Sequence, residues 1–254
     1  MLNADKIGRP LAKVVGGDRD GAIISVSDKF NDKDAKTESK SFKICHEGIF
    51  QQIPDTTKER EIIYITGCSG SGKSTYTRKF IEQHKKNNPD IEIYLFSALP
   101  DDESLDSVEP KRIILDDTII SDPIDVKEFG GCIVIFDDID VLPNKKIREE
   151  VYKILNQILE IGRHYKINCI VTNHLPTNGR DTRRILNESS CFVYFPHSAN
   201  AKIKYFLTEY VGIDKKMISK LKRQQSRWVC LYKNYPMVYL TERQIGLVNA
   251  IDDD

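Results

Sequence analysis

The sequence predicts an α/β fold with a central, mainly parallel sheet. Apolar, β-branched runs alternate with amphipathic runs between residues 59 and 196, which is the order that parallel strands joined by crossover helices produce. A glycine-rich loop at residues 67–74 lies between the first of these strands and the first helix. The chain has 254 residues, of which 40% are hydrophobic, and this is enough for one sizeable core with a small appended subdomain.

Residues 59–196 supply the elements of the predicted core domain. A buried strand is expected at 61–66, because this run is apolar and β-branched apart from its ends. A helix is expected at 76–86, which contains no Gly or Pro, and a second at 147–161, whose apolar side chains recur on one face. The remaining strands of this domain are expected at 91–96, 112–115, 132–136, 167–172 and 191–195.

Residues 1–58 are predicted to form a small β element beside the core domain. The run at 22–26 is typical of a strand, and a second short strand is expected within 41–50. Between them, the polar and charge-mixed stretch 29–40 is expected to be a mobile loop.

Residues 197–254 are predicted to be a basic helical and hairpin extension of the same domain as the core. The helical part is expected at 199–223, and the hairpin from residues 227–231 and 237–240. The stretch 202–227 contains eight lysines and arginines against two acidic residues. Such a surface can follow phosphates without reading sequence, although a solvated helical face is the usual meaning of such a run.

The glycine-rich loop fits the phosphate-binding pattern G-x-x-x-x-G-K-[ST] at every position. Its glycines allow backbone N–H groups to turn toward phosphate oxygens, and the helix that follows presents the positive end of its dipole. Lys73 is expected to reach the β- and γ-phosphates of ATP, and the Ser74 hydroxyl to hold Mg²⁺. The predicted nucleotide-binding residues are Gly67, Cys68, Ser69, Gly70, Ser71, Gly72, Lys73, Ser74 and Thr75.

Two acidic residues follow the apolar strand at 132–136. A nucleotide hydrolase needs a carboxylate for Mg²⁺ and a group that orients the attacking water. Asp137, the first acid after the strand, is expected to reach the Mg²⁺ shell, and Asp138 to polarise the water. Asp140 competes with Asp138 for that second role, and turn chemistry alone also favours Asp at a strand exit.

The strand at 167–172 is followed by Asn173 and His174. Because the carboxyl ends of parallel strands face the ligand crevice, Asn173 is a candidate sensor of the γ-phosphate or holder of the water. An ordinary strand exit explains Asn173 equally well, and explains His174 better. A further positive charge usually stabilises the transition state. The candidates are Arg163, Arg180, Arg183 and Arg184. One of them is expected to reach a phosphate on a neighbouring subunit, and the alternative for each is a solvated surface arginine.

Composition indicates which partners and which cell compartment to expect for the protein. Lysines and arginines number 38, as do the acidic residues, so global charge argues neither for nor against a nucleic-acid partner. The six cysteines include no C-x-x-C pair, which favours a reducing compartment without a disulfide framework. The sequence shows no signal peptide and no apolar run long enough for a transmembrane segment. A soluble, intracellular protein is therefore expected.

Five motifs in this order resemble the genome-packaging ATPases of large DNA viruses, the poxvirus-like branch of the FtsK–HerA superfamily. They are the phosphate loop at 67–74, Asp137-Asp138, Gly162-Arg163-His164, Thr172-Asn173-His174 and Arg184-Ile185-Leu186-Asn187. The resemblance covers roughly residues 55–245. The phosphate loop is common to all P-loop proteins, so the downstream series and its short spacing carry the resemblance.

The resemblance implies a RecA-like P-loop NTPase core that binds ATP and Mg²⁺ and translocates double-stranded DNA into a capsid. It implies a ring of five or six identical subunits, and capsid or inner-membrane proteins of a virion as further partners. It also implies a sensor at Asn173, an arginine finger at Arg163 or Arg184, and a location in a viral factory of the host cytoplasm or in the virion. Many members of the superfamily carry Asp-Glu where this chain has Asp137-Asp138, so the water-activating role of the shorter Asp138 is in question.

Two other function classes remain open from the sequence. A nucleotide or small-molecule kinase also begins with a phosphate loop, and residues 176–184 could imitate its arginine-rich lid. A P-loop switch or assembly scaffold would bind nucleotide without moving DNA. The acid pair after a long apolar strand, and the polar residue after the next strand, favour hydrolysis over phosphate transfer.

Overall fold

The computed structural model describes residues 1–29, 34–198 and 202–248, and it divides the chain into two compact units. One unit consists of Glu59–Ser189 with Asn200–Ile203. The other consists of Met1–Lys58, Ser190–Ala199 and Lys204–Asp254. The contacts thus group the N-terminal residues with the C-terminal strands, whereas the sequence had suggested three successive segments. The mobile loop expected at 29–40 lies partly outside the described residues.

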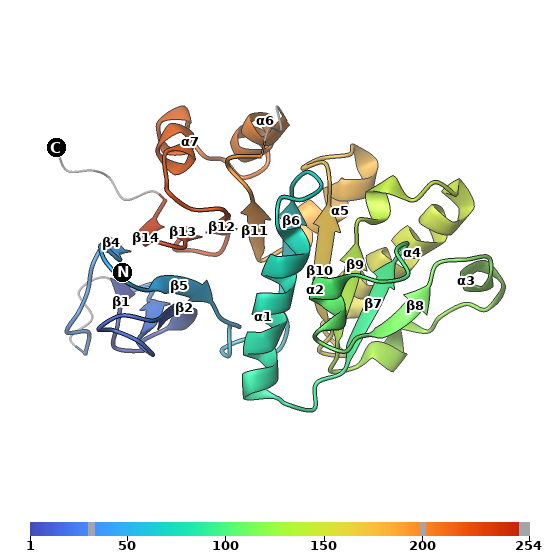
Figure 1. Cartoon of the computed structure of the whole chain (residues 1–254), viewed down its shortest axis with the longest axis horizontal. Helices are drawn as coiled ribbons and strands as arrows, with labels where there is room; N and C mark the ends of the chain where they lie inside the picture. The colour runs from blue at the N-terminus through green and yellow to red at the C-terminus, as the bar shows by residue number, and fades with distance from the viewer. Residues whose placement is uncertain (30–33, 199–201, 249–254) are drawn as a thin grey trace. The chain divides into compact units, whose positions relative to one another are not determined.

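The first unit is built on five parallel strands (Figure 1). Their order is β6 (Ile62–Thr66), β10 (Asn168–Asn173), β9 (Ile133–Asp137), β7 (Ile93–Ser97) and β8 (Lys111–Ile114). Every residue of β6 and β9 is buried, as expected for parallel strands covered on both faces. The predicted α/β fold class with a mainly parallel sheet is confirmed.

Helices α1 (Lys73–Asn87) and α4 (Lys145–Ile161) are the long crossover helices of this unit. The connection through α1 runs from β6 to β7, and the connection through α4 runs back from β9 to β10. Right-handed crossovers in opposite directions place their helices on opposite faces of the sheet. Helix α5 (Arg180–Glu188) follows β10 and packs on α4. The chain therefore leaves the neighbouring strands β6 and β10 toward opposite faces, and ligands of open α/β sheets bind at the carboxyl ends of such strand pairs.

Shorter elements complete the first unit. They are α2 (Glu103–Asp106), α3 (Thr118–Ser121) and the 3₁₀ turns η1 (Val126–Phe129) and η2 (Ile139–Val141). Helix α2 packs against α1, and α3 packs against α4. In the described residues, no helix is long and apolar enough to cross a membrane.

The second unit contains two antiparallel sheets. One has the order β1 (Leu2–Asn3), β3 (Ile23–Val26), β2 (Arg9–Val15) and β5 (Ile49–Gln52). The strands β4 (Ser41–Lys43), β14 (Gln244–Leu247), β13 (Val238–Thr241), β12 (Val229–Tyr232) and β11 (Cys191–Tyr194) form the other series of antiparallel neighbours. The strand expected at 191–195 is thus present, but it pairs antiparallel with β12.

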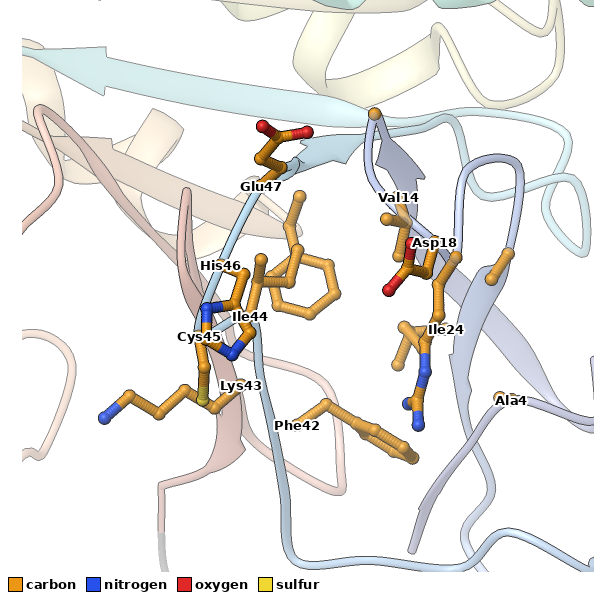
Figure 2. A pocket seen from close by; sticks show the side chains of 14 residues that line it. Ala4, Val14, Asp18, Ile24, Phe42, Lys43, Ile44, Cys45, His46 and Glu47 are labelled. Atoms are coloured by element: carbon orange, nitrogen blue, oxygen red, sulfur yellow. The ribbon is translucent and has the colours of Figure 1, made fainter.

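Side chains join the two sheets of the second unit. The Tyr232 hydroxyl donates to the Leu11 carbonyl at 3.1 Å, and the Arg9 guanidinium lies 5.1 Å from the centre of the Tyr232 ring. Beside the first sheet, Val14, Ile24 and Phe42 line a hollow of about 270 Å³, which Figure 2 shows from close by.

The basic stretch of this chain forms two short helices. Helix α6 covers Lys202–Glu209 and α7 covers Lys215–Lys222. Gly212 between them has a φ of 76°, a left-handed conformation that breaks the helical path. Asp214 then caps α7 by accepting from the Met217 amide at 2.7 Å.

Candidate nucleotide-binding site

The loop at 67–74 joins the carboxyl end of β6 to the first turn of α1. Gly70 and Gly72 have φ angles of 73° and 107°, which L side chains rarely adopt. Helix α1 has no side-chain cap at its N-terminus and no acidic residue in its first turn. Its free N–H groups and its dipole therefore remain available for an anion. The buried Ser71 hydroxyl also lacks a partner among the described residues.

Lys73 lies at the start of α1 and is only 6% exposed. Its ammonium donates to the Gly67 carbonyl at 3.0 Å and lies 3.3 Å from Asp138 Oδ2. A buried lysine needs such partners, because desolvation of an unpaired charge is costly. Phosphate oxygens of a bound nucleotide would offer the same ammonium stronger, charge-assisted hydrogen bonds.

Asp137 ends β9 and is 4% exposed. Its carboxylate accepts from the Thr172 hydroxyl at 2.9 Å and from the Ser97 hydroxyl at 3.3 Å. Burial, and secondly the charge of Asp138, raise the pKa of the Asp137 carboxyl above its usual value. A divalent cation beside this carboxylate would offset both effects by favouring its ionised form.

The residues present fit Mg²⁺. Ser74 is half-buried in the first turn of α1, next to Lys73. One carboxylate from Asp137 and one hydroxyl from Ser74 are hard oxygen ligands of the kind that Mg²⁺ prefers. Mg²⁺ usually takes its remaining ligands from water and from substrate phosphates.

Asp138 follows Asp137 in a left-handed backbone conformation, with φ 48° and ψ 39°. Its amide donates to the Thr172 carbonyl at 3.1 Å and to the Thr172 hydroxyl at 3.0 Å. Its carboxylate lies 3.3 Å from the Lys73 ammonium and 2.9 Å from Nε2 of His174. The side chain stays 27% exposed, so water can reach it. Non-Gly residues in this conformation are uncommon and concentrate at functional sites.

Asp140 is held in a different way. Its carboxylate accepts from the backbone amides of His174 at 3.1 Å and Leu175 at 3.3 Å. Burial raises the pKa of the Asp140 carboxyl. These bonds fix the chain after β10, and they favour Asp138 over Asp140 as the acid that faces the water.

Asn173 is the last residue of β10 and is buried. Its carbonyl accepts from the Gly67 amide at 3.1 Å, which ties the end of β10 to the phosphate loop. The side-chain amide donates to the Tyr64 hydroxyl at 3.1 Å, and Tyr64 donates to the Leu175 carbonyl at 2.9 Å. The remaining amide oxygen, Oδ1, is buried without a partner among the described residues. That acceptor is free to bind a polar group in the crevice.

The two candidate arginines lie elsewhere. Arg163 is exposed and lies just after α4. The Gly131 amide, just before β9, donates to the Tyr165 carbonyl at 2.8 Å. This bond places the segment that contains Arg163 near the amino end of β9. Arg184 on α5 pairs with Glu160 of α4 at 2.5 Å. The structure therefore brings Lys73, Asp137, Asp138 and Asn173 together, but neither arginine joins them within one subunit.

A virophage protein is similar to almost the whole chain. Uncharacterized protein V3 of Sputnik virophage is 39% identical over 245 residues, which span 95% of this chain and 96% of that protein. The chain belongs to the family of V3. No protein-family model matches the chain.

Solved structures place this V3-family protein among P-loop ATPases by fold. The genome packaging NTPase B204 of Sulfolobus turreted icosahedral virus 2, in complex with AMPPCP, has a TM-score of 0.50 and 15% identity, over 72% of this chain and 97% of that one. The cytoplasmic domain of the type VII secretion ATPase EccC of Thermomonospora curvata has a TM-score of 0.53 and 11% identity, over 80% of this chain and 28% of that one. The resemblance to viral packaging ATPases is thereby confirmed for the fold.

Sequence reasoning missed three supporting residues. Thr172 contacts both acids, Tyr64 holds the Asn173 amide, and Ser97 holds Asp137. His174 was expected to be an ordinary strand exit, yet its ring lies against Asp138. The sequence did contain a signal for Thr172 and Ser97, because each ends an apolar run. The carboxyl ends of parallel strands meet at one edge of a sheet, so both residues could have been expected near Asp137.

Proposed function

We propose that this V3-family protein is a Mg²⁺-dependent ATPase that translocates double-stranded DNA and packages a viral genome as a ring of five or six subunits. The observation that carries the proposal is the contact between Lys73 of the phosphate loop and Asp138, held beside the buried Asp137. A phosphate-binding lysine and a water-facing carboxylate at one crevice suit hydrolysis. The fold shared with a viral genome packaging NTPase and a secretion ATPase supports an NTPase motor.

The arrangement suggests how hydrolysis proceeds. ATP phosphates bind the loop amides and attract the Lys73 ammonium, which weakens its pairing with Asp138. Asp138, still held by Thr172 and His174, then accepts the proton of the water that attacks the γ-phosphorus. The bond from the γ-phosphorus to the oxygen that bridges the β- and γ-phosphates breaks, and ADP leaves with that electron pair. Asn173 Oδ1 can accept from the same water. Ser74 and Asp137 would hold Mg²⁺, which neutralises charge on the β- and γ-phosphates.

The test is ATP hydrolysis by the full chain with and without duplex DNA. We expect hydrolysis that duplex DNA stimulates. Lys73→Ala should abolish hydrolysis and greatly weaken nucleotide binding, whereas Lys86→Ala, an exposed lysine in the last turn of the same helix, should leave both unchanged. Circular dichroism of each variant checks that the fold is intact.

The same assay separates the alternatives. Phosphate transferred to a small acceptor would indicate a kinase. Nucleotide binding with negligible turnover, with or without DNA, would indicate a switch or scaffold. Near-normal turnover in folded Lys73→Ala would place the active site elsewhere.

A further inference from the structure

A second hollow in the unit formed by the N- and C-terminal segments is lined by cationic and amide side chains. Its volume is about 550 Å³. Three segments that are distant in sequence contribute Lys43, Arg223, Gln224, Gln225, Arg243 and Gln244. None of the residues that line it is acidic. Because the whole chain has a net charge of zero, this grouping is a local concentration of positive charge.

Strand pairing builds one wall of this basic hollow. Lys43 of β4 lies opposite Gln244 of β14, and Phe42 lies opposite Ile245. Alternation along a strand puts each of these pairs on its own face of the sheet. Figure 2 shows the consequence, because the Lys43 side chain extends away from the neighbouring hollow of about 270 Å³, into which Phe42 points.

Backbone contacts fix the other parts of the basic hollow. Nη1 of Arg243 donates to the carbonyls of His46 and Gly48, at 2.6 and 2.8 Å. This double contact holds the turn before β14 against the segment that follows β4. Arg223 directly follows α7, where its amide donates to the Lys220 carbonyl at 3.2 Å, and its side chain is exposed.

We infer that the basic hollow binds the sugar–phosphate backbone of duplex DNA. Lysine and arginine neutralise phosphates, and glutamine amides donate to phosphate and sugar oxygens without reading bases. Arg223 of the hollow directly follows α7, on which Lys215, Lys220 and Lys222 are exposed. The inference rests on the proposed function and deepens it, because it assigns the DNA contact to a surface that unites Lys43 and Arg243 with the basic segment.

Alkylation of the native cysteines can show directly where duplex DNA covers the protein. Of the six cysteines, only Cys45 and Cys68 are exposed. Cys45 lines the basic hollow, and Cys68 lies in the phosphate loop. We expect mixed-sequence duplex DNA to slow alkylation of Cys45 and to leave Cys68 unaffected, while ATP should protect Cys68 alone. Mass spectrometry of the alkylated full chain measures both sites in one sample.

Paired charge variants test the energetics. Lys43→Gln with Arg223→Gln removes two cations of the hollow, and Arg243 is kept because it supports the backbone. The matched control is Lys127→Gln with Lys146→Gln, two exposed lysines of the nucleotide-binding unit. The hollow variant should bind duplex DNA more weakly and lower the slope of log affinity against log salt by about two, since each phosphate contact contributes roughly one. Basal hydrolysis without DNA should be unchanged in both variants.

The outcomes distinguish this inference from the proposed function. If wild type binds duplex DNA but Cys45 stays unprotected, or if the hollow variant matches its control, the basic hollow is not the DNA site and the motor proposal stands. If wild type binds no DNA at any salt, both are overturned. Inorganic phosphate that protects Cys45 as well as duplex DNA does would reassign the hollow to a small anion.

Ala substitution of Lys215, Lys216, Lys220 and Lys222 should also lower affinity for every duplex alike.

Discussion

At the scale of single residues, Asp138 connects the phosphate loop to the end of β10. Its left-handed backbone turns the carboxylate away from the strand direction, so that it meets Lys73 and His174 at 3.3 and 2.9 Å. Asp137, one residue earlier, stays buried with Thr172 and Ser97. The two adjacent acids therefore face different environments, and we expect them to have different roles.

Substitution of the two acids should separate metal binding from catalysis. Asp138→Asn should keep Mg²⁺-ATP binding but lower hydrolysis roughly 10²- to 10⁴-fold, the range usual for loss of a general base. Asp137→Asn should instead weaken Mg²⁺ binding and raise the Mg²⁺ concentration needed for activity. Titration of Mg²⁺ at saturating ATP, with nucleotide binding measured separately, checks both. A defect confined to Asp140→Asn would show that the acids have been assigned wrongly.

His174 should act as a positioning residue for Asp138. His174→Ala removes the 2.9 Å contact with the carboxylate, so kcat should fall roughly tenfold or more while KM for ATP changes little, because misplacement of a reacting group slows the chemical step. His174→Asn retains an N–H donor and should recover part of kcat. Steady-state kinetics of the two variants test this role. An equal loss of kcat in His174→Ala and His174→Asn, or a change in KM alone, would contradict it.

The sequence predicted those site residues that a local pattern specifies. The phosphate loop and Asp137-Asp138 each follow a buried apolar run, so their position at the carboxyl edge could be inferred. The His174–Asp138 contact joins residues 36 positions apart, and it depends on the strand order and on the left-handed turn at Asp138. Neither feature leaves a pattern in the local sequence.

At the scale of elements, long apolar strands and helices were predictable and short ones were not. Helix α4 begins two residues before the expected 147 and ends at the expected 161. Its apolar face and its Asn144 cap both favour a helix over these residues. Strands β1, β2 and β14 were missed. Strand β1 has two residues, β2 contains Pro10 beside a bulge, and β14 contains Gly246, so pairing partners rather than propensity stabilise them.

Helix α1 carries a buried histidine that should make stability depend on pH. Burial lowers the pKa of His84 to about 4. Glu61 lies 3.8 Å away and would raise that pKa, but His84 Nε2 has no hydrogen-bond partner in the described part of the chain, so the cost of desolvation prevails. A histidine with a lowered folded pKa contributes stability that is complete above its unfolded value near 6.5 and is lost as pH falls toward 4.

We therefore predict that the free energy of unfolding falls by on the order of 3 kcal/mol between pH 6.5 and 4 because of His84. Urea denaturation at several pH values measures this dependence. His84→Leu should remove most of it, whereas the exposed His46→Gln should not. Identical pH dependence in wild type and His84→Leu would show that carboxylates alone govern acid unfolding.

At the scale of the whole molecule, neither Arg163 nor Arg184 has a described contact with Lys73, Asp137, Asp138 or Asn173 of its own subunit. Arg163 lies beside the amino end of β9, and Arg184 pairs with Glu160 at the carboxyl end of α4, from which the chain enters the amino end of β10. The phosphate loop lies at the opposite, carboxyl edge of the sheet. If either arginine stabilises the transition state, a neighbouring subunit must donate it. A ring meets this requirement, because each head-to-tail interface joins two different surfaces.

Mixing of inactive subunits tests this arrangement. Lys73→Ala lacks the phosphate ligand but keeps both arginines, and Arg163→Ala or Arg184→Ala keeps the phosphate loop. In a mixed ring, some interfaces pair an intact loop with an intact arginine, so hydrolysis should reappear when Lys73→Ala is combined with the variant that lacks the true finger. The measurement is ATP turnover against mixing ratio, with co-assembly verified by size-exclusion chromatography and light scattering. If neither mixture recovers activity although the subunits co-assemble, the positive charge comes from another residue or from the same subunit.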